Sequence, residues 1–207
     1  MSFLRQIFGS SQEEIWQQLC NEIGAEFVQG GFWKGSKVVA RVKEWTITLD
    51  AYSQTTSTGQ TSTTRTYTRF RAPYVNSDGF RFKIYRQGLF DGVGKLFGAQ
   101  DIEVGYPDFD NDFIIQGNNA HKVRQLFANP IIRQLIQAQP QILFEVKDDE
   151  GWFGASFPEG VDELYFQAYG VIRDVEQLKS LYELFAETLN HLCYIGSAYE
   201  NNPNLNL

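Results

Sequence analysis

The chain has 207 residues, of which 43% are apolar and 21% are charged, as is ordinary for a globular protein. This composition excludes a wholly disordered chain, and a protein of this length buries a core without disulfides or metal ions. The net charge of −7 is unevenly distributed, because residues 1–99 carry +4 and residues 100–207 carry −11. That division argues against a nucleic-acid-binding protein that acts through its whole surface.

The ends of the sequence and its cysteines indicate a cytoplasmic protein. No run approaches the roughly 18 apolar residues that span a bilayer, and the N-terminus lacks the apolar run of a secretory signal. Cys20 and Cys193 have neither CxxC spacing nor a disulfide framework around them, which is typical of a reducing compartment. Residues 1–9 place four apolar side chains on one helical face, so a docked terminus and a peripheral membrane contact both stay open. These side chains are Phe3, Leu4, Ile7 and Phe8.

The first part of the chain predicts one helix followed by strands. Ser11 and Glu14 form a capping box, and apolar residues spaced four apart predict a helix that ends near the following Gly-Gly pair. Alternating apolar residues predict strands over 38–42 and 45–49. Residues 53–68 hold eleven Ser or Thr in sixteen positions, and because Thr is β-branched they favour a long polar hairpin.

Two further strands are expected over 67–74 and 80–85. They are joined by Asn-Ser-Asp-Gly at 76–79, a cluster of turn-forming residues that predicts a hairpin between them. The glycine-rich residues 88–98 then interrupt the strand pattern. Their spacing fits neither a P-loop nor a dinucleotide-binding motif, and we expect no cofactor.

The second half predicts a helix pair between strands. Residues 109–116 are expected as a strand, and Asn118 or Asn119 then caps a helix. An Asn-Pro pair at 129–130 opens a second helix, because proline is tolerated at the first helical position, and Pro140 ends it.

The last part of the chain predicts more strands and a long helix. Strands over 142–146 and 152–157 flank a turn at 148–151, and another strand is expected over 164–171. A helix of about six turns begins after Asp174. Because strands follow one another rather than alternating with helices, the class is α+β. We expect a largely antiparallel sheet packed by the N-terminal helix, the central helix pair and the long C-terminal helix.

We expect a single α+β domain over 1–207, in which residues 197–207 form a tail. A helix followed by strands occurs in both halves, so a division into two subdomains, about 10–98 and 99–196, is the alternative. No residue-level repeat links the two halves.

An acidic cluster between residues 101 and 112 is the candidate for metal chemistry. Residues 108–112 begin like a calcium loop, but Phe113 stands where that loop needs glycine and Asn119 where it needs glutamate. If the segment is extended, its acids share one strand face, which could recruit a divalent ion or form a solvated acidic edge. The candidate ligands are Asp108, Asp110 and Asp112, with Asp101 and Glu103 just upstream.

A basic and aromatic segment between residues 65 and 86 is the candidate binding surface. If it forms strands, the odd-numbered residues from Arg65 to Arg71 share one face, and such a face attracts acidic protein segments, anionic lipid or RNA. We expect the face to be exposed and uncompensated. The alternative is that it pairs with the acidic half of the same chain or of a second copy. The candidate binding residues are Arg65, Arg69, Arg71, Arg81, Lys83 and Arg86.

Residues 107–113 read Pro-Asp-Phe-Asp-Asn-Asp-Phe and are followed by the two predicted helices. This pattern resembles a group of uncharacterised bacterial proteins that share a strand of the form Pro-x-Phe-[Asp/Asn]-x-x-Phe before a short helix pair. The resemblance covers about residues 80–195. It implies a bacterial, intracellular protein, with no known activity and no functional residues to transfer.

No residue pattern nominates a nucleophile or an acid–base pair, and the leading interpretation is a non-catalytic intracellular binding or adaptor protein. We expect a protein partner or self-association, and no nucleic acid. The competing interpretation is a metal-dependent hydrolase that uses the acidic cluster of residues 101–112.

Overall fold

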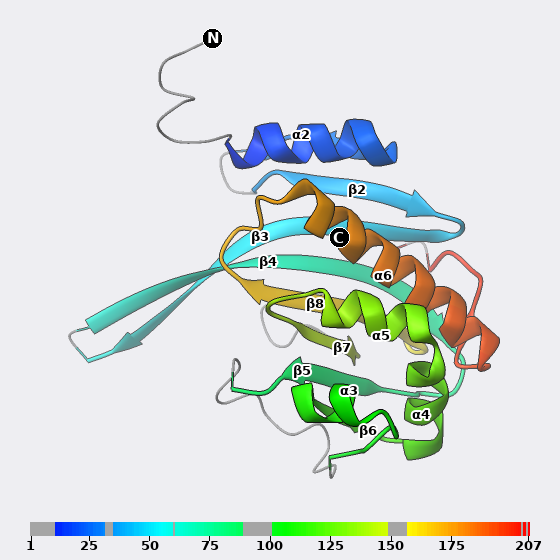
Figure 1. Ribbon diagram of the computed structural model, residues 1–207. Coiled ribbons are helices and arrows are strands. Elements are labelled where there is room, and N and C mark those ends of the chain that lie inside the picture. Colours follow the sequence, from blue (N-terminus) through cyan, green and yellow to red (C-terminus); the bar gives the residue numbers. More distant parts are fainter. Residues whose placement is uncertain are drawn as a thin grey trace.

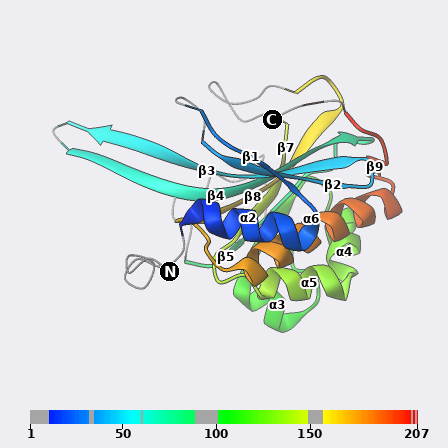
Figure 2. The ribbon, with the colours of Figure 1, turned by 90° about the horizontal axis from the view of Figure 1, so that it is seen from above.

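The computed structural model is a two-layer α+β fold in which one antiparallel sheet carries its helices on a single face (Figures 1 and 2). Among the described residues the sheet has nine strands, in the order β1-β2-β3-β4-β8-β7-β5-β6 with β9 beside β4. The predicted fold class is confirmed. The structure describes residues 11–31, 35–59, 61–88, 101–148, 157–203, 205 and 207.

The elements alternate irregularly along the chain, and their bounds are as follows. The strands are β1 (Glu26–Val28), β2 (Lys37–Val42), β3 (Trp45–Thr58), β4 (Thr61–Asn76), β5 (Phe82–Arg86), β6 (Phe113–Gly117), β7 (Leu143–Lys147), β8 (Val161–Tyr169) and β9 (Ala198–Tyr199). The helices are α2 (Gln12–Ile23), α3 (Pro107–Asp112), α4 (Ala120–Ala128), α5 (Pro130–Gln137) and α6 (Val175–Tyr194).

The predicted capping box starts α2. The Glu14 main-chain N–H donates to Ser11 Oγ at 3.2 Å, and the Ser11 N–H donates to the Glu14 carboxylate at 3.1 Å. The helix ends earlier than expected, at Gly24, whose φ of 70° is the left-handed conformation that terminates helices. Phe27, which the four-residue spacing of apolar residues places in the predicted helix, therefore lies in β1.

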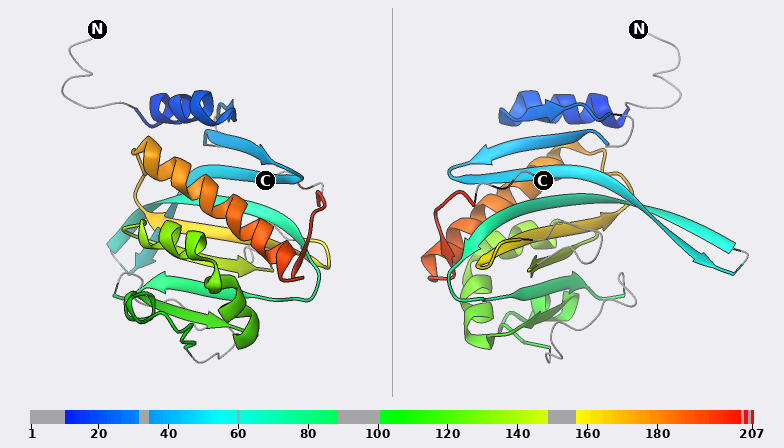
Figure 3. Two further views of the ribbon diagram at one scale, coloured as in Figure 1. Left: turned by 45° about the vertical axis from the view of Figure 1, so that its right-hand side comes forward. Right: turned by 180° about the vertical axis from the view of Figure 1, so that it is seen from behind.

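The predicted polar hairpin is confirmed and is longer than its neighbours in the sheet. β3 and β4 pair from Thr48–Arg71 out to Thr58–Thr61. β2 accompanies β3 only as far as Asp50, and the ladder of β8 on β4 begins at Thr68. Residues 51–58 and 61–67 therefore project beyond the sheet, and we call them the arm (Figure 3).

The predicted hairpin between β4 and β5 is wrong, although its turn forms. Asn76 Oδ1 accepts the Gly79 N–H at 2.9 Å, and Asn76 Nδ2 donates to the Asp162 carboxylate of β8. β8 pairs with β4 over eight residue pairs, so the edge that β5 would need is occupied. Two strands, β8 and β7, separate β5 from β4, and β5 pairs with β6 and β7 instead.

Aromatic rings from the sheet and from α6 form the centre of the core. Phe70 on β4 is fully buried, and its ring lies 4.9 Å from Tyr182 and 5.8 Å from Phe185, both on α6. Phe166 on β8 lies 5.9 Å from Phe70. α6 crosses this face of the sheet, so the long predicted C-terminal helix is the element on which the two layers meet (Figure 1).

The segment predicted as a tail joins the sheet in part. Ser197 is buried, and β9 pairs with Val75 and Asn76 of β4. Farther on, Lys37 donates to the main-chain oxygen of Leu207. In the part of the chain that the structure describes, no helix is both long and apolar enough to cross a bilayer. Residues 1–9, most of the glycine-rich segment 88–98 and the strand expected over 152–157, apart from residue 157, lie outside the described residues.

Replacing Phe70 by alanine leaves a cavity among three aromatic rings, because the surrounding side chains relax only in part. We expect the free energy of unfolding to fall by about 3–5 kcal/mol, measured by urea denaturation. Phe70→Leu retains most of the apolar volume and should cost clearly less. Equal losses for the two variants would contradict this account of the core.

Candidate functional site

We call the face of the sheet opposite the helices the helix-free face (Figure 3, right). The strand register places charged and tyrosyl side chains in rows across it. Asp50, Arg69 and Gln167 are direct neighbours in one row. Arg71 opposes Tyr165 in the next row, which continues through Glu145 to Lys83. Three of the six predicted binding residues therefore lie on this face at the centre of the sheet.

Asp50 binds two of the predicted basic residues. Arg69 donates to both Asp50 oxygens at 2.8 Å, and an Arg71 amino group donates to the same carboxylate at 2.8 Å. The Arg71 side chain is only 7% exposed, and those of Arg69 and Asp50 are 17% exposed. A carboxylate shared by two guanidinium groups at this depth is an interaction on which the local structure depends.

Three of the other four predicted basic residues also have carboxylate partners. Lys83 lies 2.9 Å from Glu145, its direct neighbour on β7. Arg81 lies 2.6 Å from Asp148 and 3.2 Å from Asp162. Arg86 lies 3.4 Å from Asp112.

The expectation of an exposed, uncompensated basic face is thus wrong for five of the six residues. For Arg81 and Lys83 the reason is the sheet order, which places β7 and β8 of the acidic half beside β5 and β4. The alternative, in which the basic segment pairs with the acidic half of the same chain, is confirmed for Arg81, Lys83 and Arg86. Arg69 and Arg71 pair instead with Asp50 of the first half. The binding role of all five residues stays a prediction.

Arg65 differs from the other five. It is exposed, and among the described residues no carboxylate lies within 4 Å of it. Its guanidinium lies 5.9 Å from the ring centre of Tyr169. Tyr67 lies 5.0 Å from Tyr169 and stacks on Tyr52 at 5.2 Å. Arg65 therefore stands at the end of a row of three tyrosines, of which sequence reasoning singled out only Tyr67.

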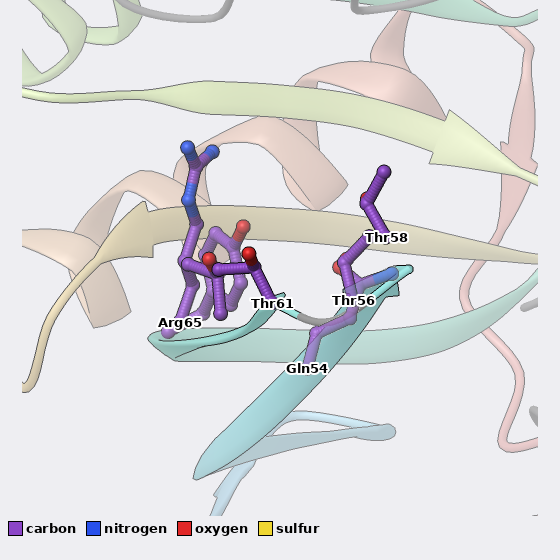
Figure 4. Close-up of a pocket in the computed structure, with 7 residues that line it drawn as sticks. Gln54, Thr56, Thr58, Thr61 and Arg65 are labelled. Carbon is purple, nitrogen blue, oxygen red and sulfur yellow. The ribbon is translucent and has the colours of Figure 1, made fainter.

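A hollow of about 400 Å³ runs along the arm beside Arg65 (Figure 4). It lies on one face of the two strands, where the side chains are neutral apart from Arg65. The opposite face carries hydroxyl pairs across the strands, such as Ser53 with Thr66 and Thr55 with Thr64, both at 2.9 Å. The hollow is lined by Gln54, Thr56, Thr58, Thr61, Thr63, Arg65 and Tyr67. We call it the arm hollow.

A second hollow, of about 540 Å³, lies where the arm meets the sheet. Its charged lining consists of Lys37, Arg69 and Arg71 with Asp50, and Leu207 also contributes to it. These groups already contact one another: Asp50 binds both arginines, and Lys37 binds the main chain of Leu207. A ligand in this second hollow would have to displace these contacts, whereas a ligand in the arm hollow would not.

The tyrosines beside this second hollow are held by one amide. The hydroxyls of Tyr52 and Tyr165 donate to Gln167 Oε1 at 2.7 and 2.8 Å. Burial raises the pKa of the Tyr165 phenol, so this hydroxyl stays protonated. The shared acceptor fixes Tyr52 in the orientation in which it stacks on Tyr67.

The acidic cluster has a different conformation from the predicted one. Residues 107–112 form α3 rather than a strand, because Pro107 starts a helical turn and Asp110 accepts the main-chain N–H groups of Val104, Gly105 and Tyr106. A helix turns about 100° per residue, so Asp108, Asp110 and Asp112 no longer share one face.

The predicted metal ligands are engaged separately. Asp101 accepts from the Gln116 amide at 3.0 Å, Asp112 contacts Arg86, and Asp110 caps its own loop. Across the described ranges, no group of three or more His, Cys, Asp or Glu side chains is placed to hold a metal ion. The expectation of a shared acidic face is therefore wrong, and the metal-dependent hydrolase loses the arrangement on which it rested.

The cysteines and histidines are not arranged as a catalytic group. Burial raises the pKa of both the Cys20 and Cys193 thiols, which disfavours the reactive thiolate. His191 lies 3.1 Å from the main-chain oxygen of Gln125 and stacks on Tyr194.

No family model and no curated protein sequence matches the chain, so the resemblance to a bacterial group stays a prediction. Among solved structures, the fold is similar to the crystal structure of the mycobacterial trehalose monomycolate transport factor A, TtfA. The two have a TM-score of 0.49 and 8% sequence identity over 87% of this chain and 94% of that chain. A likeness at this level carries no inference about function.

Asp50→Asn removes the charge that the buried Arg71 guanidinium and the partly buried Arg69 guanidinium share. We expect the free energy of unfolding to fall by about 3 kcal/mol, measured by urea denaturation. Asp148→Asn is the control, because its side chain is 57% exposed and its partner Arg81 keeps Asp162. That variant should lose less than about 1 kcal/mol. An equal cost for both variants would contradict the importance given to Asp50.

Proposed function

We propose that the protein is a non-catalytic binding module whose arm hollow receives an extended, acidic segment of a partner polypeptide. The observation that carries the proposal is the environment of Arg65. Of the six candidate basic residues, it alone has no carboxylate partner among those described, and it borders a hollow that is otherwise neutral. A partner carboxylate would supply the missing charge there.

The chemistry of the arm hollow favours a polypeptide in extended conformation. The hollow follows two strands, so a segment lying in it meets threonine hydroxyls and the Gln54 amide at the spacing of a β-strand. These groups donate and accept hydrogen bonds without charge and suit main-chain amides or polar side chains.

The tyrosines supply a rigid base for such contacts. Tyr67 is 5% exposed and lies between Tyr52 and Tyr169. Its contact with Tyr169 holds in place the ring that lies nearest the Arg65 guanidinium. Arginine and tyrosine are the residues that most often dominate binding energy at protein interfaces. Binding at the arm also leaves the ion pairs around Asp50 intact.

We propose a cytoplasmic location, which the free cysteines Cys20 and Cys193 support, since unpaired thiols are usual in a reducing compartment. A role as an adaptor fits this arrangement, since the arm projects from the body (Figure 2).

A labelled decapeptide of alternating Glu and Thr tests the proposal by fluorescence anisotropy. We expect the wild-type protein to bind it, and Arg65→Gln to weaken binding about tenfold or more, because a charge-assisted hydrogen bond contributes roughly 1.5–3 kcal/mol. A Lys-Thr decapeptide should not bind.

Arg41→Gln is the matched control, because Arg41 is also an exposed arginine on the helix-free face and the charge change is the same. It should leave the affinity for the Glu-Thr peptide within about twofold, apart from general screening. The proposal is overturned if the wild-type protein does not bind the acidic peptide, or if the two variants lose affinity equally.

A further inference from the structure

We propose that two copies of this chain associate through the outer edge of β3 in the arm, residues 53–57, and so join their sheets. The proposal is independent of the acidic partner, because Arg65 and the arm hollow's β4 side do not lie on this edge. The strand β3 is longer than the strand β2 beside it.

The outer edge of β3 loses its neighbour halfway along. β2 pairs with β3 from Trp45 to Asp50, and beyond that point β3 pairs only with β4 among the residues that the structure describes. Residues 53–58 are exposed. A strand edge in this condition presents main-chain donors and acceptors to another strand.

The register shows which main-chain groups face outward. The Gly170 N–H donates to the Thr66 carbonyl at 2.8 Å, so the polar groups of Thr66 point away from β3. Its direct partner, Ser53, then points away from β4, and by the two-residue alternation so do Thr55 and Ser57. The short hydroxyl contacts across these pairs agree, because side chains approach most closely in non-hydrogen-bonded pairs.

This edge lacks the residues that usually discourage one strand edge from pairing with another. Residues 51–58 read Ala-Tyr-Ser-Gln-Thr-Thr-Ser-Thr, without a charge, a proline or a glycine. Natural edge strands are commonly short or carry lysine or proline, which discourages association. β1, the terminal strand of the sheet on the same side as β2, follows that rule, since it has three residues and includes Glu26.

A second copy fits the edge by symmetry. In an antiparallel pairing centred on Thr55, Ser53 of each copy opposes Ser57 of the other, so that every outward group meets an equivalent group. The hydroxyl ladder that already joins Ser53 to Thr66 and Thr55 to Thr64 would continue across the new boundary. No like charges meet along it.

The shape of the molecule permits this pairing. The arm projects away from the helices and from the body of the sheet (Figures 2 and 3). In an antiparallel arrangement the two bodies lie at opposite ends of the paired arms and do not compete for the same space.

Sedimentation velocity across a range of protein concentrations tests the proposal with the full chain. We expect a reversible dimer for the wild type. Thr55→Pro removes an outward N–H at the centre of the pairing and should weaken the dimer at least tenfold. Thr64→Pro is the matched control: it removes an outward N–H from the β4 edge of the arm, and the dimer should persist.

A second pair of variants keeps the test valid if proline disturbs the arm. Thr55→Lys brings two like charges together at the two-fold axis and should also abolish the dimer, whereas Thr64→Lys should not. A wild-type protein that is monomeric at every concentration overturns the proposal. So does a dimer that survives both Thr55 variants, or one that the Thr64 variants weaken equally.

Discussion

The alternation of side chains along β4 is the constraint on which the rest of the structure depends. Successive residues of a strand point to opposite faces, so Phe70 enters the core while Arg69 and Arg71 face the other way. β4 pairs with β3 on one side and β8 on the other, and it therefore joins strands from the basic and acidic halves of the chain. The burial of Phe70 beneath α6 fixes this register. A shift by one residue would bring the arginines into the aromatic core.

The same strand pairing brings basic residues of the first half of the sequence against acidic residues of the second half. Lys83 on β5 meets Glu145 on β7, and Arg81 meets Asp162 on β8, so cations of the first half are neutralised by anions of the second. Asp50 makes the exception within the first half, where one carboxylate serves two guanidinium groups. The uneven charge is thus largely internal to the fold and does not by itself mark a surface for a polyanion.

The sequence predicted what depends on local patterns and failed where distant strands decide. The capping box at Ser11, the polar hairpin and the C-terminal helix follow from spacing and residue type, and the structure confirms them. The residues around Phe109 were expected to be extended because they alternate, but the Asp110 carboxylate collects three main-chain N–H groups and favours a helical turn. Of the candidate site, the shared face of the basic residues was predictable. The carboxylate partners of Arg81 and Lys83 were not, because no local signal places β7 and β8 beside β5 and β4.

Among the six candidate basic residues, Arg65 of the arm alone has no carboxylate partner in the described part of the chain, and the reason is geometric. Within the body, each cation of β4 has a neighbouring strand that supplies a carboxylate. Beyond Thr68 the ladder of β8 is absent, and beyond Asp50 so is that of β2. Arg65 is the first cation of β4 past both limits, and the outward main-chain groups of Ser53 and Thr55 on β3 lie beyond the end of the β2 ladder. A charge without a carboxylate partner and main-chain groups without a neighbouring strand therefore occur together, where β3 and β4 extend beyond β2 and β8. A partner at the arm satisfies both without breaking an ion pair, whereas a ligand at the second hollow must compete with Asp50.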